Sequence, residues 1–219
     1  MPENEKWVDH IINTPGRVLG PRVSYSIIND PRRLVIGLSR YKFCAKMLKG
    51  KNKVIEVGCG DAFGAPIVAQ EVDELVCIDI ESKLIEGNRR RLADLNKIQF
   101  VTLDITKGVP DGKFDGGYSL DVLEHIPSEF EPMYFQHTCN CLKDNAIFIV
   151  GVPNITADGY ASKPGHSPHV NLKDESALRD VFVRYFQNTL IFSMNDEVVH
   201  TGYTPMAHYL FALGIGLRK

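Results

Sequence analysis

Two glycines directly after a short apolar run are the first residues whose spacing could do chemistry. Residues 54–57 (Val-Ile-Glu-Val) lead into the turn 58–61 (Gly-Cys-Gly-Asp). Glycines in such a turn allow a tight bend and let a ligand approach the backbone closely. Asp79 ends the next apolar run, 21 residues after Gly58, where a carboxylate can accept hydrogen bonds from both hydroxyls of a ribose. Together these features indicate a nucleoside site, although an ordinary tight strand–helix turn would also explain the glycines alone.

Position 63 bears on which nucleoside would bind. The dinucleotide fingerprint G-x-G-x-x-G needs glycine there, and this chain has Phe63. A pyrophosphate binds at an open helix N-terminus, and a phenylalanine is a poor neighbour for it. No Gly-Lys-Ser/Thr sequence follows, so a phosphate-binding P-loop is absent. A cofactor without phosphate, adenosine joined to an amino acid, suits this turn better.

The elements that must position these residues follow from the apolar pattern. Asp30-Pro31 indicates the start of a helix, because Asp is a good N-cap and Pro is favoured in the first turn. Continuous apolar runs are typical of a parallel sheet covered on both faces. They predict strands over 54–57, 75–80, 98–102, 114–120 and 146–150, with helices near 64–71, 82–96, 128–141 and 174–185.

This alternation predicts an α/β fold with a doubly wound, mostly parallel, seven-stranded sheet. The last two strands, at 189–193 and near 206–213, have no helix between them. We expect them to pair as an antiparallel hairpin at the sheet edge. Residues 1–29 contain two Pro-Gly turn signals and are expected to form a loosely structured arm or cap. Residues 30–219 form the single domain.

Composition narrows the function classes. The 219 residues have 44% apolar and 24% charged side chains, and the net charge of −2 offers no basic excess for nucleic acid. Five irregularly spaced cysteines suit reduced thiols. The longest apolar stretch, Tyr209 to Leu217, is too short to cross a membrane, and the first residues do not resemble a signal peptide. We therefore expect a cytoplasmic protein without nucleic-acid or membrane partners.

Four motifs in order resemble a known family. They are 54–61 (Val-Ile-Glu-Val-Gly-Cys-Gly-Asp), 77–80 (Cys-Ile-Asp-Ile), 103–105 (Leu-Asp-Ile) and 120–125 (Leu-Asp-Val-Leu-Glu-His). They look like the successive cofactor motifs of class I S-adenosylmethionine-dependent methyltransferases, and are most similar to the group that includes the ubiquinone-biosynthesis O-methyltransferases. The resemblance covers roughly residues 30–185 and implies a Rossmann-like methyltransferase fold.

The resemblance implies a set of contacts to S-adenosylmethionine. Glu56 would act near the ammonium of its methionine portion, beside the backbone of Gly58 and Gly60. Asp79 would bind the ribose hydroxyls, and Ile80 would pack on the adenine. The full implied set of cofactor-binding residues is Arg40, Tyr41, Glu56, Gly58, Cys59, Gly60, Asp79, Ile80, Asp104, Ile105, Leu120 and Asp121.

The remaining implied contacts come from later strands and from the first helix. Asp104 would accept from the adenine amino group, with a backbone contact from Ile105, while Leu120 and Asp121 would lie beside the sulfonium. Arg40-Tyr41 would reach the cofactor carboxylate, a role for which Arg33 competes. One position departs from the family, since Ala62 stands where the turn usually has a third glycine and disfavours a positive φ.

Three histidines are candidates for the acceptor side. His125 follows the fourth strand, and it could act as a general base toward a hydroxyl or simply cap and pack a helix. His166 and His169 lie in the polar loop 153–173, which would cover the acceptor pocket, so they are expected to bind substrate. Because His166-x-x-His169 lacks two further obvious ligands in the sequence, we expect no metal.

The resulting prediction is methyl transfer to oxygen of a small molecule or glycan intermediate. The Asp/Asn-Pro-Pro-Tyr/Phe motif of nucleic-acid N-methyltransferases is missing after the fourth strand. The alternatives are a non-catalytic module that binds the same cofactor and, less favoured, an N- or C-methyltransferase. Phe63 disfavours a nicotinamide-dependent reductase. The polar segment 192–202 could contribute to the acceptor pocket or to a homodimer.

Overall fold

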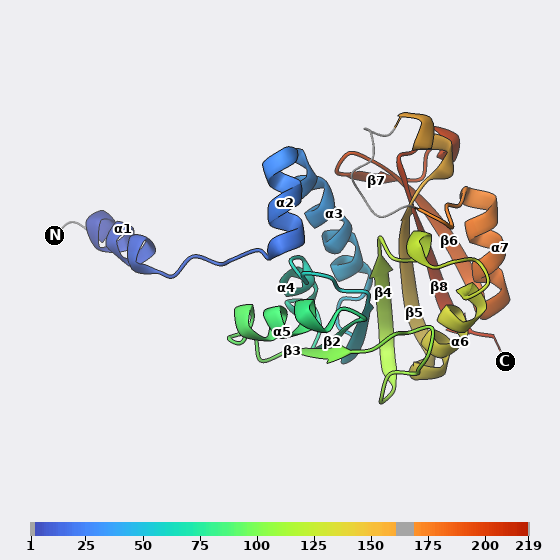
Figure 1. Ribbon diagram of the computed structural model, residues 1–219, viewed down its shortest axis with the longest axis horizontal. Helices are drawn as coiled ribbons and strands as arrows, with labels where there is room; N and C mark the ends of the chain where they lie inside the picture. Colours follow the sequence, from blue (N-terminus) through green and yellow to red (C-terminus); the bar gives the residue numbers. More distant parts are fainter. Residues whose placement is uncertain (1–2, 161–168, 219) are drawn as a thin grey trace.

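A single eight-stranded sheet forms the centre of the protein in the computed structural model, which describes residues 3–160 and 169–218 (Figure 1). The strand order is β3-β2-β1-β4-β5-β8-β6-β7. The strands are β1 Lys53–Val57, β2 Glu74–Asp79, β3 Ile98–Thr102, β4 Phe114–Leu120, β5 Leu142–Pro153, β6 Phe186–Asn195, β7 Val198–His200 and β8 Tyr209–Leu217.

The first five strands are mutually parallel, as the continuous apolar runs predict. In β1, β2 and β4 almost every residue is buried, because helices cover both faces. The sheet order reverses between β1 and β4, which makes the carboxyl ends of these two strands the expected place for a ligand.

The C-terminal strands differ in two ways from the predicted edge hairpin. β8 pairs antiparallel with β6, as expected, but it also pairs antiparallel with β5 and therefore lies inside the sheet. A short additional strand, β7, pairs with β6 at the edge and raises the count from seven to eight. The chain reaches β6 from β5 through a helix, which leaves a gap one strand wide that β8 fills.

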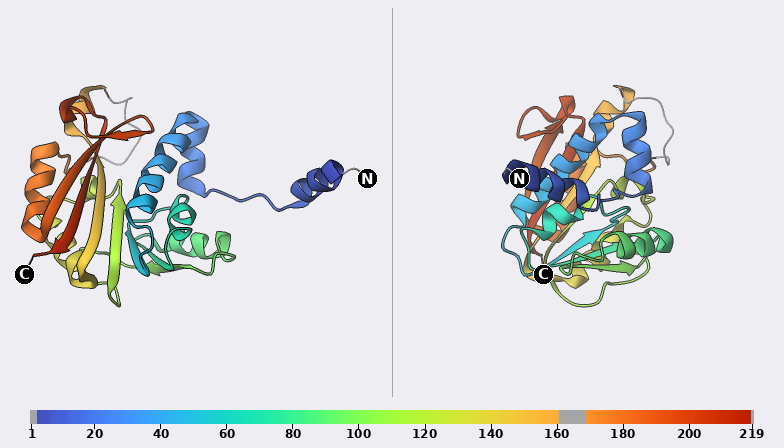
Figure 2. Two further views of the ribbon diagram at one scale, coloured as in Figure 1. Left: turned by 180° about the vertical axis from the view of Figure 1, so that it is seen from behind. Right: turned by 90° about the vertical axis from the view of Figure 1, so that its left-hand side faces the viewer.

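Helices pack on both faces of the sheet (Figure 2). One buried cluster includes side chains of α3, α4 and α5, and a second on the opposite face includes those of α6 and α7. The helices are α1 Glu3–Asn13, α2 Pro21–Asn29, α3 Arg32–Met47, α4 Ala65–Ala69, α5 Ser82–Arg91, α6 Glu131–Cys141 and α7 Glu175–Tyr185, with short 3-10 turns η1 Leu123–His125, η2 Ile155–Tyr160 and η3 Thr204–Met206.

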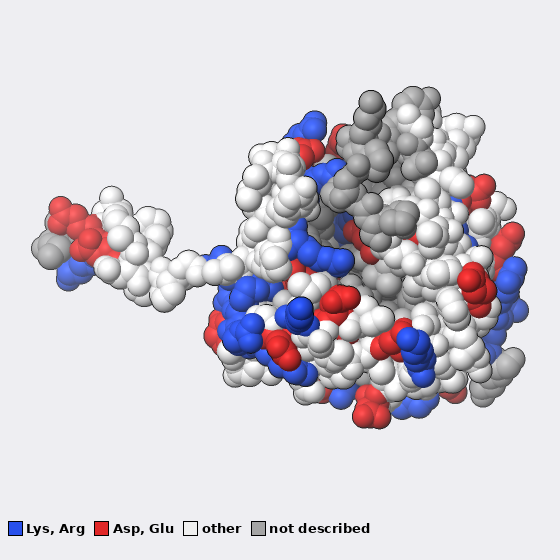
Figure 3. All heavy atoms as spheres, in the orientation of Figure 1, with Lys and Arg blue, Asp and Glu red and all other residues white. Residues whose placement is uncertain are grey.

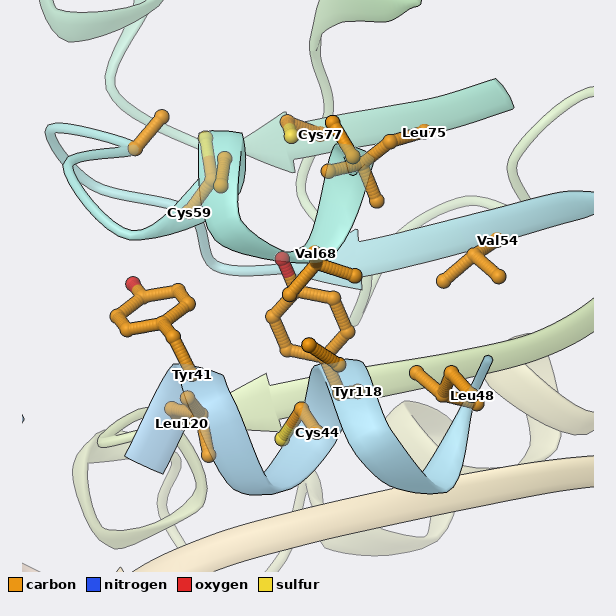
Figure 4. Close-up of a cluster of buried hydrophobic side chains, with 14 of the residues drawn as sticks. Tyr41, Cys44, Leu48, Val54, Cys59, Val68, Leu75, Cys77, Tyr118 and Leu120 are labelled. Carbon is orange, nitrogen blue, oxygen red and sulfur yellow. The ribbon is translucent and has the colours of Figure 1, made fainter. Parts of the chain in front are cut away.

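The first cluster fixes α3 against the sheet under the glycine turn (Figure 4). Tyr41 and Cys44 of α3, and Leu48 just after it, point toward the sheet, where Cys59, Tyr118 of β4 and Val54 of β1 lie. Close approach at the top of this cluster depends on Gly64, since a Cβ at that position would lie 2.1 Å from the Tyr41 ring. This packing places the residues around Arg40 and Tyr41 at the carboxyl ends of the strands.

The N-terminal segment is more ordered than the predicted loose arm. α1 stands away from the domain, but α2 packs against α3 (Figures 1 and 2). The backbone N–H of Val23, in the first turn of α2, donates to Oδ2 of Asp61 at 2.7 Å, so the carboxylate satisfies an otherwise orphan helix donor. Arg91 Nη1 donates to the carbonyl of Val18 at 2.8 Å. Residues 18–29 are thus tied to the glycine turn and to α5.

No helix within residues 3–160 or 169–218 is long and apolar enough to span a membrane.

Candidate cofactor and acceptor site

The predicted site residues gather at the carboxyl ends of β1 to β4. This edge of the sheet lies between the α2–α3 side of the protein and its C-terminal half, and Figure 3 shows that the surface there is hollowed. Parallel strands bring residues from distant motifs to one edge, so the four motifs of the sequence meet there.

The glycine turn adopts the left-handed conformation that its sequence suggests. Gly58 has a φ of +77° and Gly60 a φ of +50°. A Cβ on Gly58 would lie 2.3 Å from Cγ2 of Val122, whereas one on Gly60 would meet nothing closer than Arg22 Nη1 at 3.5 Å. The turn is therefore packed against Val122, just after β4, on one side and lies beside Arg22 of α2 on the other.

Ala62 adopts a conformation that favours glycine. Its φ is +50°, in the left-handed region, and the side chain is fully buried. Alanine in this region carries about 1–2 kcal/mol of strain. Cys59 packs its buried side chain beside Asn88, as a small residue in a turn does.

Asp79 is a buried carboxylate that holds the glycine turn. Its Oδ2 accepts from the N–H of Gly60 at 2.7 Å, and its Oδ1 accepts from the N–H of Glu81 at 2.9 Å. The residue is 8% exposed, and carboxylate oxygens have further lone pairs for a ligand. Next to it, the apolar Ile80 is 60% exposed, as a residue that covers an adenine ring would be without its partner.

Asp104 and Ile105 follow β3. Burial acts to raise the pKa of Asp104, but hydrogen bonds from Thr106 and the ammonium of Lys107 outweigh it and hold the pKa below its ordinary value. The carbonyl of Ile105 lies 2.7 Å from Nδ1 of His137, and the Ile105 side chain is buried. Asp104 is thus an ionised acceptor, while Ile105 contributes packing.

Glu56 is a buried acid beneath the turn. Only 1% of the residue is exposed, and Oε2 accepts from the thiol of Cys77 at 3.2 Å. Burial raises the pKa of Glu56 to about 7, while the Cys77 thiol and the hydroxyls of Tyr118 and Tyr41 favour its ionised form and oppose the effect. A cationic ammonium nearby would stabilise the carboxylate further.

Arg40 and Tyr41, which were predicted to act as a pair, point in different directions in the structure. Tyr41 is buried, with its ring 5.2 Å from Phe63 in an edge contact, and burial raises the pKa of its hydroxyl well above the ordinary value. Arg40 instead binds Asp121, with Nη1–Oδ2 at 2.6 Å, and its guanidinium lies 3.7 Å above the ring of Tyr209. On a helix, neighbouring residues point in different directions, so the two residues serve separate parts of the site.

The end of β4 carries the last cofactor candidates. Leu120 is buried, and Asp121 directly after it has a φ of +56°, in the left-handed region where a non-glycine residue is strained. The N–H of Asp121 donates to the carbonyl of Gly151 at 3.0 Å, which fixes this bend to β5. Strained backbone at the end of a central strand is a common feature of ligand sites.

His125 and His169 lie together, although 44 residues separate them in the sequence. Their ring centroids are 5.1 Å apart, and both residues are exposed. His125 ends η1, the short turn that follows β4, as the sequence predicts. His166 lies outside the described residues.

Two functional candidates were missed by sequence reasoning. Glu124 is 1% exposed beside both histidines, and its burial, together with the charge of Asp121, raises its pKa well above the ordinary value. Its position inside the motif 120–125 was an available signal. Asp61 caps α2, and only its place in the glycine turn could have singled it out.

The arrangement fits S-adenosylmethionine on three observations of the chain itself. The turn has left-handed backbone at Gly58 and Gly60, the carboxylate of Asp79 lies beside an exposed apolar Ile80, and a buried acid with a raised pKa lies under the turn. An adenosine with an attached amino acid has a matching set of groups. Asp79, Asp104 and Glu56 would hold its ribose, adenine and ammonium.

Comparisons with known proteins agree with this geometry. Residues 55–150 match the family described as "Methyltransferase domain". Among curated proteins, Phosphoethanolamine N-methyltransferase 1 of Arabidopsis thaliana is 30% identical over 139 residues, which is 58% of this chain and 28% of the relative. A protein of Mycolicibacterium smegmatis named "Probable S-adenosylmethionine-dependent methyltransferase" is 25% identical over 121 residues, 52% of this chain and 42% of the relative.

A solved structure shows the same fold. The methyltransferase domain of bacterial CtHen1-C superposes with a TM-score of 0.69 at 14% identity, covering 83% of this chain and 99% of that chain. The match to each of the two curated relatives spans less than half of the relative's length. Residues 55–150 therefore resemble a methyltransferase domain that uses S-adenosylmethionine, and the chain has the fold of the solved methyltransferase domain.

Proposed function

We propose that this chain transfers the methyl group of S-adenosylmethionine to an oxygen atom of a small polar molecule such as a glycan intermediate. The observation that carries the proposal is the position of His125, an exposed imidazole at the end of η1, the short turn that follows the strand where the sulfonium would lie. Imidazole titrates near neutral pH and suits removal of a proton from a hydroxyl.

The reaction needs alignment more than covalent help from the protein. The acceptor oxygen forms its bond to the methyl carbon in line with the carbon–sulfur bond, and the electron pair of that bond passes to sulfur, leaving S-adenosylhomocysteine. The hydroxyl proton passes to His125. Leu120 and Asp121 would flank the methyl group, and His169 would contact the acceptor beside His125.

In this proposal the remaining cofactor contacts follow the motif order. Asp79 binds the ribose, Ile80 covers the adenine, Asp104 accepts from its amino group and Glu56 faces the ammonium. Arg40 is a cation at the end of β4, and its ion pair with Asp121 makes it a positioning residue rather than a direct ligand of the cofactor carboxylate. Kinship with the ubiquinone-biosynthesis O-methyltransferases is part of the same proposal.

Nitrogen is the second candidate acceptor atom, because a curated relative is named as an N-methyltransferase. An unprotonated amine attacks without a base, so a dependence on His125 favours oxygen. A non-catalytic binding module finds less support, since Ala62 keeps the left-handed turn and the acidic set at 56, 79 and 104 is intact. We further expect a cytoplasmic protein, a possible homodimer, and no nucleic-acid partner, the last in line with the net charge of −2.

Cofactor binding tests the first half of the proposal. We expect micromolar affinity for S-adenosylhomocysteine by isothermal titration calorimetry, and a loss of at least about tenfold in Asp79→Asn, which keeps the shape of the side chain. Asp73→Asn is the matched control, because Asp73 is exposed just before the opposite end of the same strand. Equal affinity in wild type and Asp79→Asn would overturn the cofactor assignment.

Product analysis tests the acceptor atom. The enzyme is incubated with S-adenosylmethionine carrying a carbon-13 methyl group and with matched pools of hydroxyl and amine acceptors. We expect methoxy products by NMR and a loss of at least about a hundredfold in His125→Gln. If the products are methylamines and His125→Gln does not lower their yield, the acceptor atom is nitrogen and the proposal for oxygen is wrong. Cofactor binding without any methyl consumption across both pools would favour the binding module.

A further inference from the structure

The carboxylate of Glu124 and the imidazoles of His125 and His169 form one cluster at the acceptor side of the site. A potential ligand atom from each residue lies within 4.8 Å of those of the other two. We propose that these three residues bind a divalent first-row transition-metal cation. The expectation of no metal considered His166-x-x-His169 along the sequence, whereas this cluster combines one of those histidines with two residues after β4.

The buried state of Glu124 points to a ligand. The residue is 1% exposed, and its Oε2 has no hydrogen-bond partner among the described residues. Leaving a carboxylate oxygen buried and unpaired costs free energy, and a bound cation is one of the few ways to offset that cost. The two histidines beside it are exposed, so a cation could enter from solvent.

Asp121 is left out of the proposed ligand set because it already has a cationic partner. Both of its carboxylate oxygens accept from Nη1 of Arg40, at 2.8 and 2.6 Å. In contrast, Oε2 of Glu124 has no hydrogen-bond partner in the described residues, so this oxygen is available to a cation.

The backbone holds the third ligand in place although it comes from a distant loop. The N–H groups of Val170 and Asn171 donate to the carbonyl of Glu124 at 2.8 and 3.1 Å. These bonds attach the segment after His169 directly to η1, which carries the other two ligands. A site prepared in this way loses little conformational entropy when the cation binds.

A buried ion pair anchors the same segment from the other side. Lys173 Nζ lies 2.7 Å from Oε2 of Glu131, and Nδ2 of Asn171 donates to that oxygen at 2.9 Å. Lys173 is 8% exposed, so this link is screened from solvent. The segment 170–173 is thereby fixed to both η1 and α6.

The ligand types select the metal. Two imidazoles and one carboxylate suit borderline cations such as cobalt, zinc, iron and manganese better than magnesium or calcium, which prefer oxygen ligands. Three protein ligands leave coordination positions for other molecules. An acceptor with two neighbouring oxygen atoms is the class of substrate that such a site would take.

The consequence for the reaction rests on the proposed methyl transfer to oxygen. A cation beside the acceptor hydroxyl lowers the pKa of its proton, which leaves to solvent water. The oxygen then bonds to the methyl carbon as the carbon–sulfur bond breaks and its electron pair passes to sulfur. His125 acts in this case as a ligand, and its substitution lowers both cation affinity and methyl transfer.

The test is a titration of the chelator-treated full chain with Co²⁺, followed by visible absorption. We expect one equivalent to bind, with an affinity at least about tenfold lower in His169→Ala and in Glu124→Gln. His10→Ala is the matched control, because His10 is an exposed histidine of α1, outside the cluster. Affinity for S-adenosylhomocysteine and the thermal melt verify that each variant is folded.

The outcomes separate the two proposals. Absence of Co²⁺ binding, or equal binding by wild type and His169→Ala, overturns the metal site even if methyl transfer occurs. Stoichiometric binding lost in both cluster variants supports the metal site even if no acceptor is methylated. If only Glu124→Gln fails to fold, His169→Ala decides, since its side chain is exposed and its removal leaves the core unchanged.

Discussion

Arg40 of α3 and Asp121, the first residue after β4, form an ion pair with Nη1 and Oδ2 2.6 Å apart. The same guanidinium lies 3.7 Å above the ring of Tyr209 in β8. One side chain thus connects a helix, the end of a central parallel strand and the antiparallel strand inserted beside β5. These contacts help to hold Asp121 in its left-handed conformation next to the acceptor side.

The contacts of Arg40 predict that the substitution Arg40→Lys lowers the stability of the protein. Lysine keeps the charge but lacks the planar group that stacks on an aromatic ring. Because the Asp121 side chain is 44% exposed, its ion pair is screened, and most of the loss should come from the contact with Tyr209. We expect the free energy of unfolding to fall by about 1 kcal/mol in urea denaturation.

A double-mutant cycle identifies the partner. Arg40→Lys should cost less in a Tyr209→Leu background and the same in Tyr209→Phe, which retains the ring. An equal cost in all three backgrounds would mean that stacking contributes nothing.

The left-handed conformation of Ala62 predicts that replacing this buried alanine by glycine has little effect on stability. Glycine relieves about 1–2 kcal/mol of strain at a φ of +50°. It also loses about 0.8 kcal/mol of methyl burial and about 0.4–1 kcal/mol through the freer unfolded chain. Because these terms nearly cancel, Ala62→Gly should change the free energy of unfolding by less than about 1 kcal/mol.

The matched control is Ala65→Gly, at the first position of α4. Ala65 is equally buried, but it begins a helix and is not among the residues with a positive φ, so nothing offsets the losses. We expect a destabilisation of about 1–2 kcal/mol. The same cost for both substitutions in thermal denaturation would refute strain at Ala62.

Glu56 predicts that stability declines toward neutral pH. Its pKa is about 7 in the folded protein against a reference of 4.5, so the folded state binds the proton more tightly than the unfolded chain. The corresponding stabilisation is complete below about pH 4.5 and is lost as the pH rises through about 7. The effect is of the order of 3 kcal/mol. Unfolding measured from pH 5 to 8 should show it.

Two variants isolate this contribution. Glu56→Gln should flatten the curve over that range, and the exposed Glu86→Gln should leave it unchanged. If the ammonium of the cofactor lies near Glu56, affinity for S-adenosylhomocysteine should rise between pH 6 and 8 in wild type but not in Glu56→Gln. A pH-independent affinity in wild type would argue against that placement.

The Lys173–Glu131 pair predicts an effect on both stability and cation affinity. Lys173→Met leaves the Glu131 carboxylate largely buried without its cation and should destabilise the fold by about 3 kcal/mol. Adding Glu131→Gln removes the unpaired negative charge and should restore much of the lost stability. Affinity for Co²⁺ should fall in Lys173→Met, because His169 loses part of its anchor, while affinity for S-adenosylhomocysteine stays the same. Loss of both affinities together would indicate general unfolding instead.

Much of the sheet and its ligand edge could be predicted from the sequence. The strands β1, β2 and β4 are buried on both faces, so each appears as a continuous apolar run that local reading can recognise. Glu56 lies near the end of β1, Asp79 ends β2, and Gly58 begins the turn after β1. Their meeting at one edge follows from parallel topology alone, without any long-range detail.

The rest depended on contacts between distant segments, which local patterns do not encode. The insertion of β8 beside β5 depends on the gap left by the crossover to β6. The helix at residues 21–29 is held at its start by the carboxylate of Asp61, which accepts a hydrogen bond from the N–H of Val23. His169 reaches His125 only because backbone bonds attach its loop to η1.

The fold class and the ligand edge of the sheet therefore follow from local sequence, since burial and turn chemistry act over a few residues at a time. Long-range packing, in contrast, turns Arg40 to Asp121 and Tyr41 to the interior, and brings Glu124 beside two histidines. Those choices depend on which surfaces the packed helices and loops leave for each side chain, and that is settled when the whole chain folds.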